Sequence, residues 1–232
     1  MLTKTLKVRF QKDKKKVVVN VVPPDYKSEQ EMRVAYAKSY RQAIQQGVAT
    51  RPSMLELMRI EKIWSETQEN ELTELTIHAA LLEAALNEQE EQAKQKDLVL
   101  ELTKVRSKIY ELVSIKTLPL EHTAEQLAED VRMDFYIATC TFDENGCRYF
   151  RSHEDFLKRR HEADAEKIYQ SVVEELSKDN IEMLRQLPEH QWLISNKFMD
   201  RDGHLLSQEM EEAMEAAGVS PSADTMDMLK KE

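Results

Sequence analysis

Apolar and polar side chains alternate at the start of the chain. Residues 6–10 follow the period-two pattern of a half-buried strand. A β-branched run at 17–22 supplies a second strand, and the polar residues between the two runs suit a turn. Pro23 and Pro24 end the pairing, because proline has no amide hydrogen for a ladder. The pattern therefore predicts an N-terminal β-hairpin over residues 1–24.

Between residues 25 and 118 the apolar positions follow helical intervals of three and four. They form two seams, the first of Leu72, Leu75, Ala79, Leu82 and Leu86 and the second of Leu98, Leu102, Val105, Ile109 and Leu112. The polar stretch 87–97 between the seams favours two antiparallel helices that form a hairpin. It contains no Gly or Pro, so a single long rod or an oligomeric coiled coil remains an alternative.

The region 119–206 mixes helical stripes with two similar turn signatures. Strand-like segments at 137–142 and 147–150 flank the sequence Asp-Glu-Asn-Gly, which suits a type I turn with a glycine bulge. The sequence Asp-Arg-Asp-Gly at 200–203 repeats this signature. We expect an α+β region with two short β-hairpins, inside a protein that is mainly α.

Methionines are concentrated near the C-terminus, where 207–232 reads as an amphipathic helix and a mobile tail. The last 34 residues hold Met199, Met210, Met214, Met226 and Met228. Unbranched thioether side chains pack against varied partners, so this helix either binds another protein or docks onto its own domain. The candidate partner-binding residues from this helix and the first seam are Leu72, Leu75, Leu82, Leu86, Leu206, Met210 and Met214.

Composition narrows the possible classes of protein. The 232 residues include 33 Lys and Arg against 43 Asp and Glu, which gives a net charge of −10 and argues against a nucleic-acid-binding protein. Residues 1–22 are the exception, with seven basic residues and one acidic residue. No apolar run approaches the roughly 20 residues of a membrane span, and two cysteines cannot form a disulfide framework. The N-terminus lacks the apolar core of a secretory signal, which predicts a cytoplasmic protein.

The strongest metal candidate is an EF-hand-like loop. With Gly203 at the sixth place, Asp200, Asp202 and Glu209 occupy the third, fifth and twelfth places that supply calcium ligands. Phe198 would occupy the first place and offers no side-chain oxygen, so a plain hairpin turn is the favoured interpretation. The chain also lacks zinc-protease, nucleophile-elbow, phosphate-loop and dinucleotide-binding motifs. We therefore expect a protein that is not an enzyme and binds no cofactor.

Three segments resemble proteins of bacteriophages with contractile tails. They are Ala35 to Gly47 followed by Met54 to Met58 and Trp64, then Cys140 to Gly146 followed by Tyr149, Phe150, Asp155 and Phe156, and finally Lys197 to Leu205. The resemblance is to small virion-assembly and tail-assembly chaperone proteins, and it brings no catalytic residue with it.

This resemblance implies a helical, non-enzymatic morphogenesis factor, foremost a tail assembly chaperone in the host cytoplasm. Its partners would be phage structural proteins such as the tail tube or tape-measure protein, and it could form a homo-oligomer. A structural subunit of the virion, from the tail, neck or baseplate, is the first alternative. A calcium- or metal-binding protein is the second.

Overall fold

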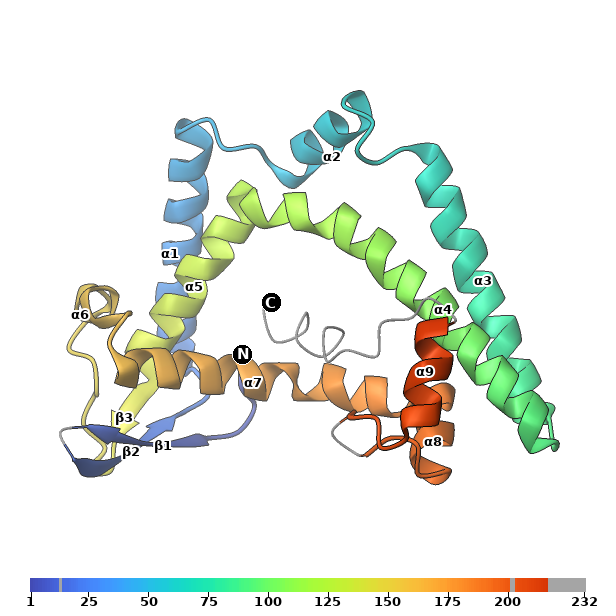
Figure 1. Cartoon of the computed structure of the whole chain (residues 1–232). Helices are drawn as coiled ribbons and strands as arrows, with labels where there is room; N and C mark the ends of the chain where they lie inside the picture. The colour runs from blue at the N-terminus through green and yellow to red at the C-terminus, as the bar shows by residue number, and fades with distance from the viewer. Residues whose placement is uncertain (13, 201–202, 217–232) are drawn as a thin grey trace. The chain divides into compact units, whose positions relative to one another are not determined.

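The computed structural model describes residues 1–12, 14–200 and 203–216 (Figure 1). In this part of the chain the protein is mainly helical, with a three-stranded antiparallel sheet in the order β1-β2-β3. The expected fold class is therefore confirmed. The expected tail, with Met226 and Met228, lies outside the described residues.

Helices account for most of the described chain, and each is labelled in its order along the sequence. The strands are β1 (Leu6–Lys12), β2 (Lys15–Val21) and β3 (Thr141–Asp143). The α-helices are α1 (Tyr26–Gln45), α2 (Arg51–Ile60), α3 (Glu66–Glu88), α4 (Gln92–Thr117), α5 (Ala124–Cys140), α6 (His153–Arg159), α7 (Ala163–Arg185), α8 (Pro188–Ser195) and α9 (Gln208–Ala216). A short 3-10 helix spans Leu118–His122.

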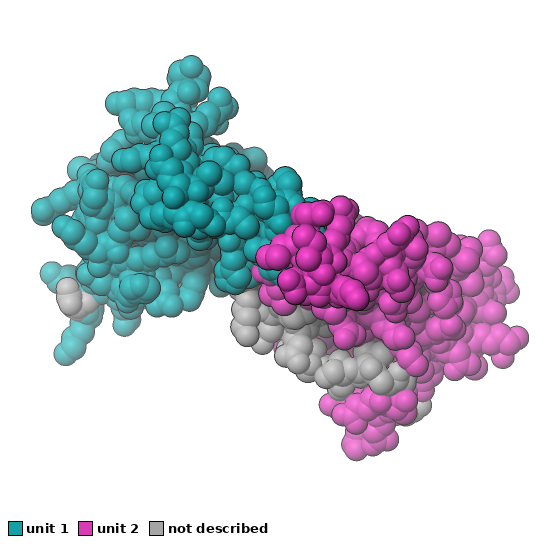
Figure 2. All heavy atoms as spheres, turned by 90° about the horizontal axis from the view of Figure 1, so that it is seen from above, with its two compact units in different colours: residues 1–55, 119–178 teal, residues 56–118, 179–232 magenta. Residues whose placement is uncertain are grey.

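The chain forms two compact units, and each unit combines two separate stretches of sequence (Figure 2). Unit 1 comprises Met1–Leu55 and Pro119–Lys178, and unit 2 comprises Glu56–Leu118 and Asp179–Glu232. The four regions expected from the sequence are consecutive, whereas these units are interleaved. The reason is that helices distant in sequence share each core.

The sheet of unit 1 begins with the predicted N-terminal hairpin. β1 and β2 pair antiparallel from Leu6 opposite Val21 to Lys12 opposite Lys15, which confirms this hairpin. β3 then adds to the other side of β2. The inner face of the sheet packs on apolar residues from α5, α6 and α7, and the most deeply buried include Val19, Tyr136, Phe150, Phe156 and Ile168.

Helices α1 and α5 run antiparallel and lie side by side in unit 1 (Figure 1). Their connections are fixed by backbone hydrogen bonds, 2.9 Å from the Ala124 amide to the Ala49 carbonyl and 2.9 Å from the Val22 amide to the Cys140 carbonyl. The buried Tyr136 hydroxyl also donates to the Val22 carbonyl. The start of α1 and the end of α5 are thereby tied to the end of β2.

A buried carboxylate joins the sheet to the α6–α7 corner. Asp164 Oδ2 accepts from Lys12 Nζ at 2.7 Å, Tyr149 Oη at 2.5 Å and Arg159 Nη2 at 2.6 Å. Burial opposes ionisation of this group, but the hydrogen bonds and the positive charges prevail and lower the pKa of Asp164 to about 2. Its position within a shell of donors makes it a structural group.

The first of the two short C-terminal hairpins is smaller than predicted. The segment 137–142 was expected as a strand, but α5 continues to Cys140 and only Thr141–Asp143 is extended. Residues 136–141 are all buried, so the pattern of burial carries no periodicity that separates a strand from a helix. The turn itself is present, with an isolated bridge between Phe142 and Arg148 and Gly146 at φ +78°.

Unit 2 is built on the predicted helical hairpin. α3 and α4 pack antiparallel, and their join covers only residues 89–91 inside the polar stretch 87–97 (Figure 1). The single-rod alternative is therefore wrong. Trp192 on α8 donates to Gln95 Oε1 at 2.9 Å, which fixes α8 against α4. The second short C-terminal hairpin is reduced to a bridge between Met199 and Leu205.

Candidate docking face on helix α3

The predicted partner-binding leucines do not share one environment. Leu82 and Leu86 are buried in the core of unit 2, together with Val99, Leu102 and Val105 of α4. Leu75 is partly buried and packs against this core, and Leu72 is half-buried at the outer end of the seam. The seam therefore serves the intramolecular hairpin.

The predicted residues near the C-terminus divide in a similar way. Met210 and Met214 on α9 belong to the same buried core as Leu82 and Leu86. Leu206 lies just before α9 and is 61% exposed. Of the two interpretations of this methionine-rich helix, the one in which it docks onto its own domain matches these positions.

The loop considered for calcium is closed by its own hydrogen bonds. Asp200 Oδ1 accepts from the His204 amide at 2.9 Å, and its Oδ2 lies 3.0 Å from His204 Nδ1. Asp202 and the side chain of Glu209 lie outside the described residues. Among the residues that are described, no group of three or more His, Cys, Asp or Glu side chains could hold a metal ion.

Helix α3 begins at a capping box. The Ser65 amide and hydroxyl both donate to Gln68 Oε1, at 2.7 and 2.9 Å. The helix then runs for 23 residues without Gly or Pro, in a sequence rich in Leu, Ala and Glu. These residue types favour helix, so the sequence supports a long, straight element.

This helix has two apolar faces. Its inner face carries the seam residues Leu75, Ala79, Leu82 and Leu86 toward the core of unit 2. On the opposite side, every exposed residue between positions 77 and 85 is apolar: Ile77, Ala80, Leu81, Ala84 and Ala85. We call these five residues the α3 outer face. Ile77 is 57% exposed and Leu81 64%, so two large side chains lie one turn apart in contact with solvent.

Helix α4 lacks such a stripe over its central part, and its exposed large apolar residues, Val113 and Ile115, lie near its C-terminal end. Between positions 97 and 111 its exposed residues are all polar: Asp97, Glu101, Lys104, Ser107, Lys108 and Glu111. An amphipathic helix that covers a core has such a polar outer side. The two helices of one hairpin therefore differ in what they present outward, although both bury an apolar seam.

The α3 outer face stands on a rigid support. Arg106 of α4 forms ion pairs with Glu83 of α3 and with Glu189 of α8. Glu189 is 1% exposed, and burial raises its pKa above the ordinary value for glutamate. Arg106 lies near the middle of α4, and its one cation thus joins α3, α4 and α8.

The open end of the hairpin has a second set of polar contacts. Glu69 accepts from Trp64 Nε1 at 2.7 Å and from Lys116 Nζ at 2.9 Å. These two hydrogen bonds lower the pKa of Glu69. The Lys116 ammonium also lies 5.2 Å from the centre of the Trp64 ring, which adds a cation–π contact. Both ends of α3 are therefore tied to α4.

The charge around the α3 outer face is entirely of one sign along the helix. α3 contains six glutamates and no lysine or arginine. Glu74 lies one turn before Ile77, Glu88 lies one turn after Ala84, and both are exposed. The surface is thus a short apolar stripe with a carboxylate at each end, and a positively charged partner is its electrostatic complement.

The sequence contained the signal for this surface. Ile77, Leu81 and Ala84 are spaced by four and three residues, which is the spacing of a second seam on the side of the helix opposite the first. From the sequence we interpreted Leu75, Ala79 and Leu82 as the apolar side of the helix, and we therefore missed the second stripe. A helix with two apolar sides offers a second surface for packing.

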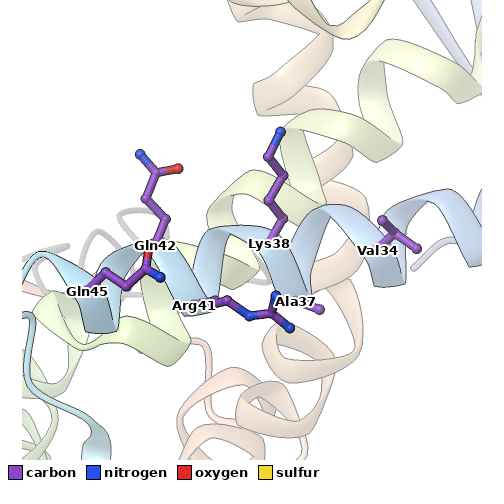
Figure 3. Close-up of a pocket in the computed structure, with 6 residues that line it drawn as sticks. All are labelled: Val34, Ala37, Lys38, Arg41, Gln42 and Gln45. Carbon is purple, nitrogen blue, oxygen red and sulfur yellow. The ribbon is translucent and has the colours of Figure 1, made fainter.

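Helix α1 in unit 1 offers a second surface of different character. Figure 3 shows Val34, Ala37, Lys38, Arg41, Gln42 and Gln45 along one side of this helix. A shallow groove of about 590 Å³ lies between α1, α5 and the start of α6, where Val34 and Ala35 face Val131 and Phe135. Glu31, Lys38 and Glu154 line the same groove, so its charge is mixed and specifies no partner.

The comparisons with known proteins found no match, whether to a family model, to a curated protein or to a solved structure. Among the described residues, no helix combines the length and the apolar character that a membrane span requires.

Proposed function

We propose that the protein is a non-enzymatic assembly factor that binds a helical segment of another protein on the α3 outer face. The observation that carries this proposal is the contrast within one hairpin: α3 leaves Ile77 and Leu81 exposed, whereas α4 exposes only polar residues over the corresponding length. Helix-in-groove and helix-on-helix recognition use such stripes of large apolar anchors.

The chemistry of the partner follows from the charges. The occupant is an amphipathic helix whose apolar side covers Ile77 and Leu81 and whose ends carry Lys or Arg opposite Glu74 and Glu88. Opposite charges at the rim accelerate association and exclude acidic competitors. A second copy of the chain would place α3 carboxylates against α3 carboxylates, which disfavours self-association through this face.

The resemblance of three segments to contractile-tail phage proteins suggests the biological context. We propose that the partner is a phage structural protein such as the tail tube or tape-measure protein, and that the protein acts as a tail assembly chaperone in the host cytoplasm. A rigid surface that covers an apolar helix until it is assembled would keep such a partner from aggregating.

The test is co-expression with the tail tube and tape-measure proteins of the same phage, followed by co-purification and measurement of the dissociation constant. The variant Ile77→Lys/Leu81→Lys places two positive charges on the α3 outer face. Glu111→Lys changes the net charge by the same amount on the outer side of α4 and is the matched control. We expect at least tenfold weaker binding for the first variant and unchanged binding for the second.

Two results would overturn the proposal. One is the lack of any complex at micromolar concentrations with either phage protein. The other is equal weakening by Ile77→Lys/Leu81→Lys and by Glu111→Lys, since that would show an effect of net charge alone. Circular dichroism of both variants controls for folding.

A structural subunit of the virion is the second candidate, and the outer edge of β1, beside which the described residues place no strand, favours it. Such an edge suits a permanent neighbour. Mass spectrometry of purified particles separates the two candidates, because a subunit is present in stoichiometric amounts whereas a chaperone is absent.

A further inference from the structure

The outer edge of β1 is a second candidate docking surface. Within the described residues, β1 has a strand on one side only, since the sheet order is β1-β2-β3. The other side of a strand carries alternate amide and carbonyl groups that are available for a further strand. This edge is seven residues long, from Leu6 to Lys12, whereas the opposite edge strand β3 has three.

A narrow groove follows this edge inside unit 1. It has a volume of about 210 Å³ and lies between residues 6–9 of β1 and one side of α7. The α7 residues that line it are spaced along a single helical row: Lys167, Ser171, Glu174, Glu175 and Lys178. α7 therefore borders the edge of the sheet without filling the place of a fourth strand.

The groove is locally positive in a protein whose net charge is −10. Lys7 and Arg9 of β1 and Lys167 and Lys178 of α7 line it, against Glu174 and Glu175. Glu175 is already paired with Lys178. The excess of positive charge distinguishes this place from the α3 outer face, where α3 supplies only carboxylates.

Lysines on an edge strand commonly protect it from aggregation, because two such edges repel one another. The same charges make the edge selective. They exclude basic strands and other copies of β1, but they attract a strand that carries carboxylates at alternate positions. Strand addition of this kind obtains affinity from backbone hydrogen bonds and specificity from alternate side chains.

We propose that the β1 edge binds an extended acidic segment of another protein by strand addition. The segment pairs with Leu6–Lys12, and its Asp or Glu side chains lie opposite Lys7 and Arg9 and near Lys167. This inference is independent of the α3 outer face, because it concerns another unit and a partner segment of opposite charge and different secondary structure.

The test uses the full chain labelled with ¹⁵N and three synthetic eight-residue peptides that alternate Val with Glu, Gln or Lys. We expect the Glu peptide to shift and protect the amides of residues 6–12, with at least tenfold higher affinity than the Gln peptide and no binding of the Lys peptide. A Glu peptide with an N-methyl group on every residue lacks the backbone donors on both of its edges and should fail to bind.

Charge reversal sharpens the test. We expect the variant Lys7→Glu/Arg9→Glu to lose binding of the Glu peptide and to gain binding of the Lys peptide. Lys27→Glu/Lys38→Glu makes the same change in net charge on α1, and we expect it to leave the preference for the Glu peptide intact. All four substituted residues are exposed, and circular dichroism verifies that the two double variants fold.

Each of the remaining outcomes would overturn the proposal. Binding that survives N-methylation, or that falls equally in the two double variants, would show non-specific electrostatic attraction. Shifts confined to residues outside β1 would place the peptide elsewhere. Sedimentation equilibrium that shows dimers lost on Lys7→Glu/Arg9→Glu would identify a second copy as the occupant.

Discussion

The two helices of the unit 2 hairpin have similar inner sides and different outer sides. Both contribute buried seams to one core, where Leu82 and Leu86 of α3 meet Val99 and Leu102 of α4. Outside, α4 exposes only polar residues between positions 97 and 111, whereas α3 exposes Ile77 and Leu81. Among the described residues, the core of unit 2 includes these inner sides but neither Ile77 nor Leu81. The outer side of α3 is therefore the part of the hairpin that stability alone does not explain.

The largest change in unfolding free energy should come from the ion pairs that Arg106 forms with Glu83 and Glu189. Arg106→Ala leaves Glu189 buried without its cation, and removal of one partner from a buried pair costs about 3–5 kcal/mol. Both tryptophans, Trp64 and Trp192, belong to unit 2, so urea unfolding followed by tryptophan fluorescence reports on this unit. We expect a large loss of unfolding free energy.

The exposed Lys104 on the outer side of α4 provides the control, and Lys104→Ala should change the unfolding free energy by about 0.5 kcal/mol or less. The double variant Arg106→Met/Glu189→Leu removes both charges and should regain most of the lost stability. If the single and double variants were equally unstable, the uncompensated carboxylate of Glu189 would not be the cause of the loss.

Two adjacent leucines separate the inner from the outer side of α3 directly. Leu82 is 7% exposed and Leu81 is 64% exposed. Leu82→Ala opens a cavity in the core and should lower the unfolding free energy by about 2–4 kcal/mol. Leu81→Ala should change it by about 0.5 kcal/mol or less, because its side chain is solvated before and after unfolding. A large loss from Leu81→Ala in the same fluorescence assay would mean that the outer side is already covered within the chain.

The sequence predicted the hairpin of unit 2 well because its seams repeat at regular intervals. Leu75, Ala79, Leu82 and Leu86 are the positions that the structure buries or partly buries. The assignment of Met210 and Met214 needed tertiary structure, since their spacing is the same whether they face their own core or a partner. The role of Arg106 was also hidden, because nothing in a linear pattern distinguishes a buried cation from an exposed one.

At the end of α5 the secondary structure predicted from the sequence was wrong. The run 137–142 has the β-branched and apolar residues of a strand, yet most of it is helix. Complete burial removes the alternation that a sequence pattern needs, and the hydroxyls of Thr139 and Thr141 donate to carbonyls four residues earlier in helical fashion. Local preference and tertiary packing thus disagree there, and packing prevails.

The pH dependence of stability tests the buried Glu189, and we expect a smaller effect there than from Arg106→Ala. Burial raises the pKa of Glu189, so ionisation of this group opposes folding. Its contribution to stability is therefore complete below the unfolded pKa of about 4.5 and is lost as the pH rises through the folded value. Glu189→Gln cannot ionise. We expect the unfolding free energy of this variant to improve relative to that of the unchanged protein as the pH rises from 4 to 7, as measured by urea titration at each pH. A constant difference would show that Arg106 fully compensates the charge.

The smallest effect should arise at the open end of the hairpin, where Glu69 is exposed. Hydrogen bonds from Lys116 and Trp64 lower the pKa of Glu69, so its contribution to stability is present above the unfolded pKa of about 4.5 and is lost as the pH falls through the folded value. The side chain is 51% exposed, so solvent screens the interaction and the loss should stay below about 1 kcal/mol. Glu69→Gln should lower the unfolding free energy slightly at pH 7 and should converge with the unchanged protein below pH 4. The difference at pH 7 should shrink in 1 M salt, because exposed ion pairs are screened. A difference that is independent of salt would contradict a role of charge in this contact, because the glutamine side chain still has an oxygen that accepts from Trp64.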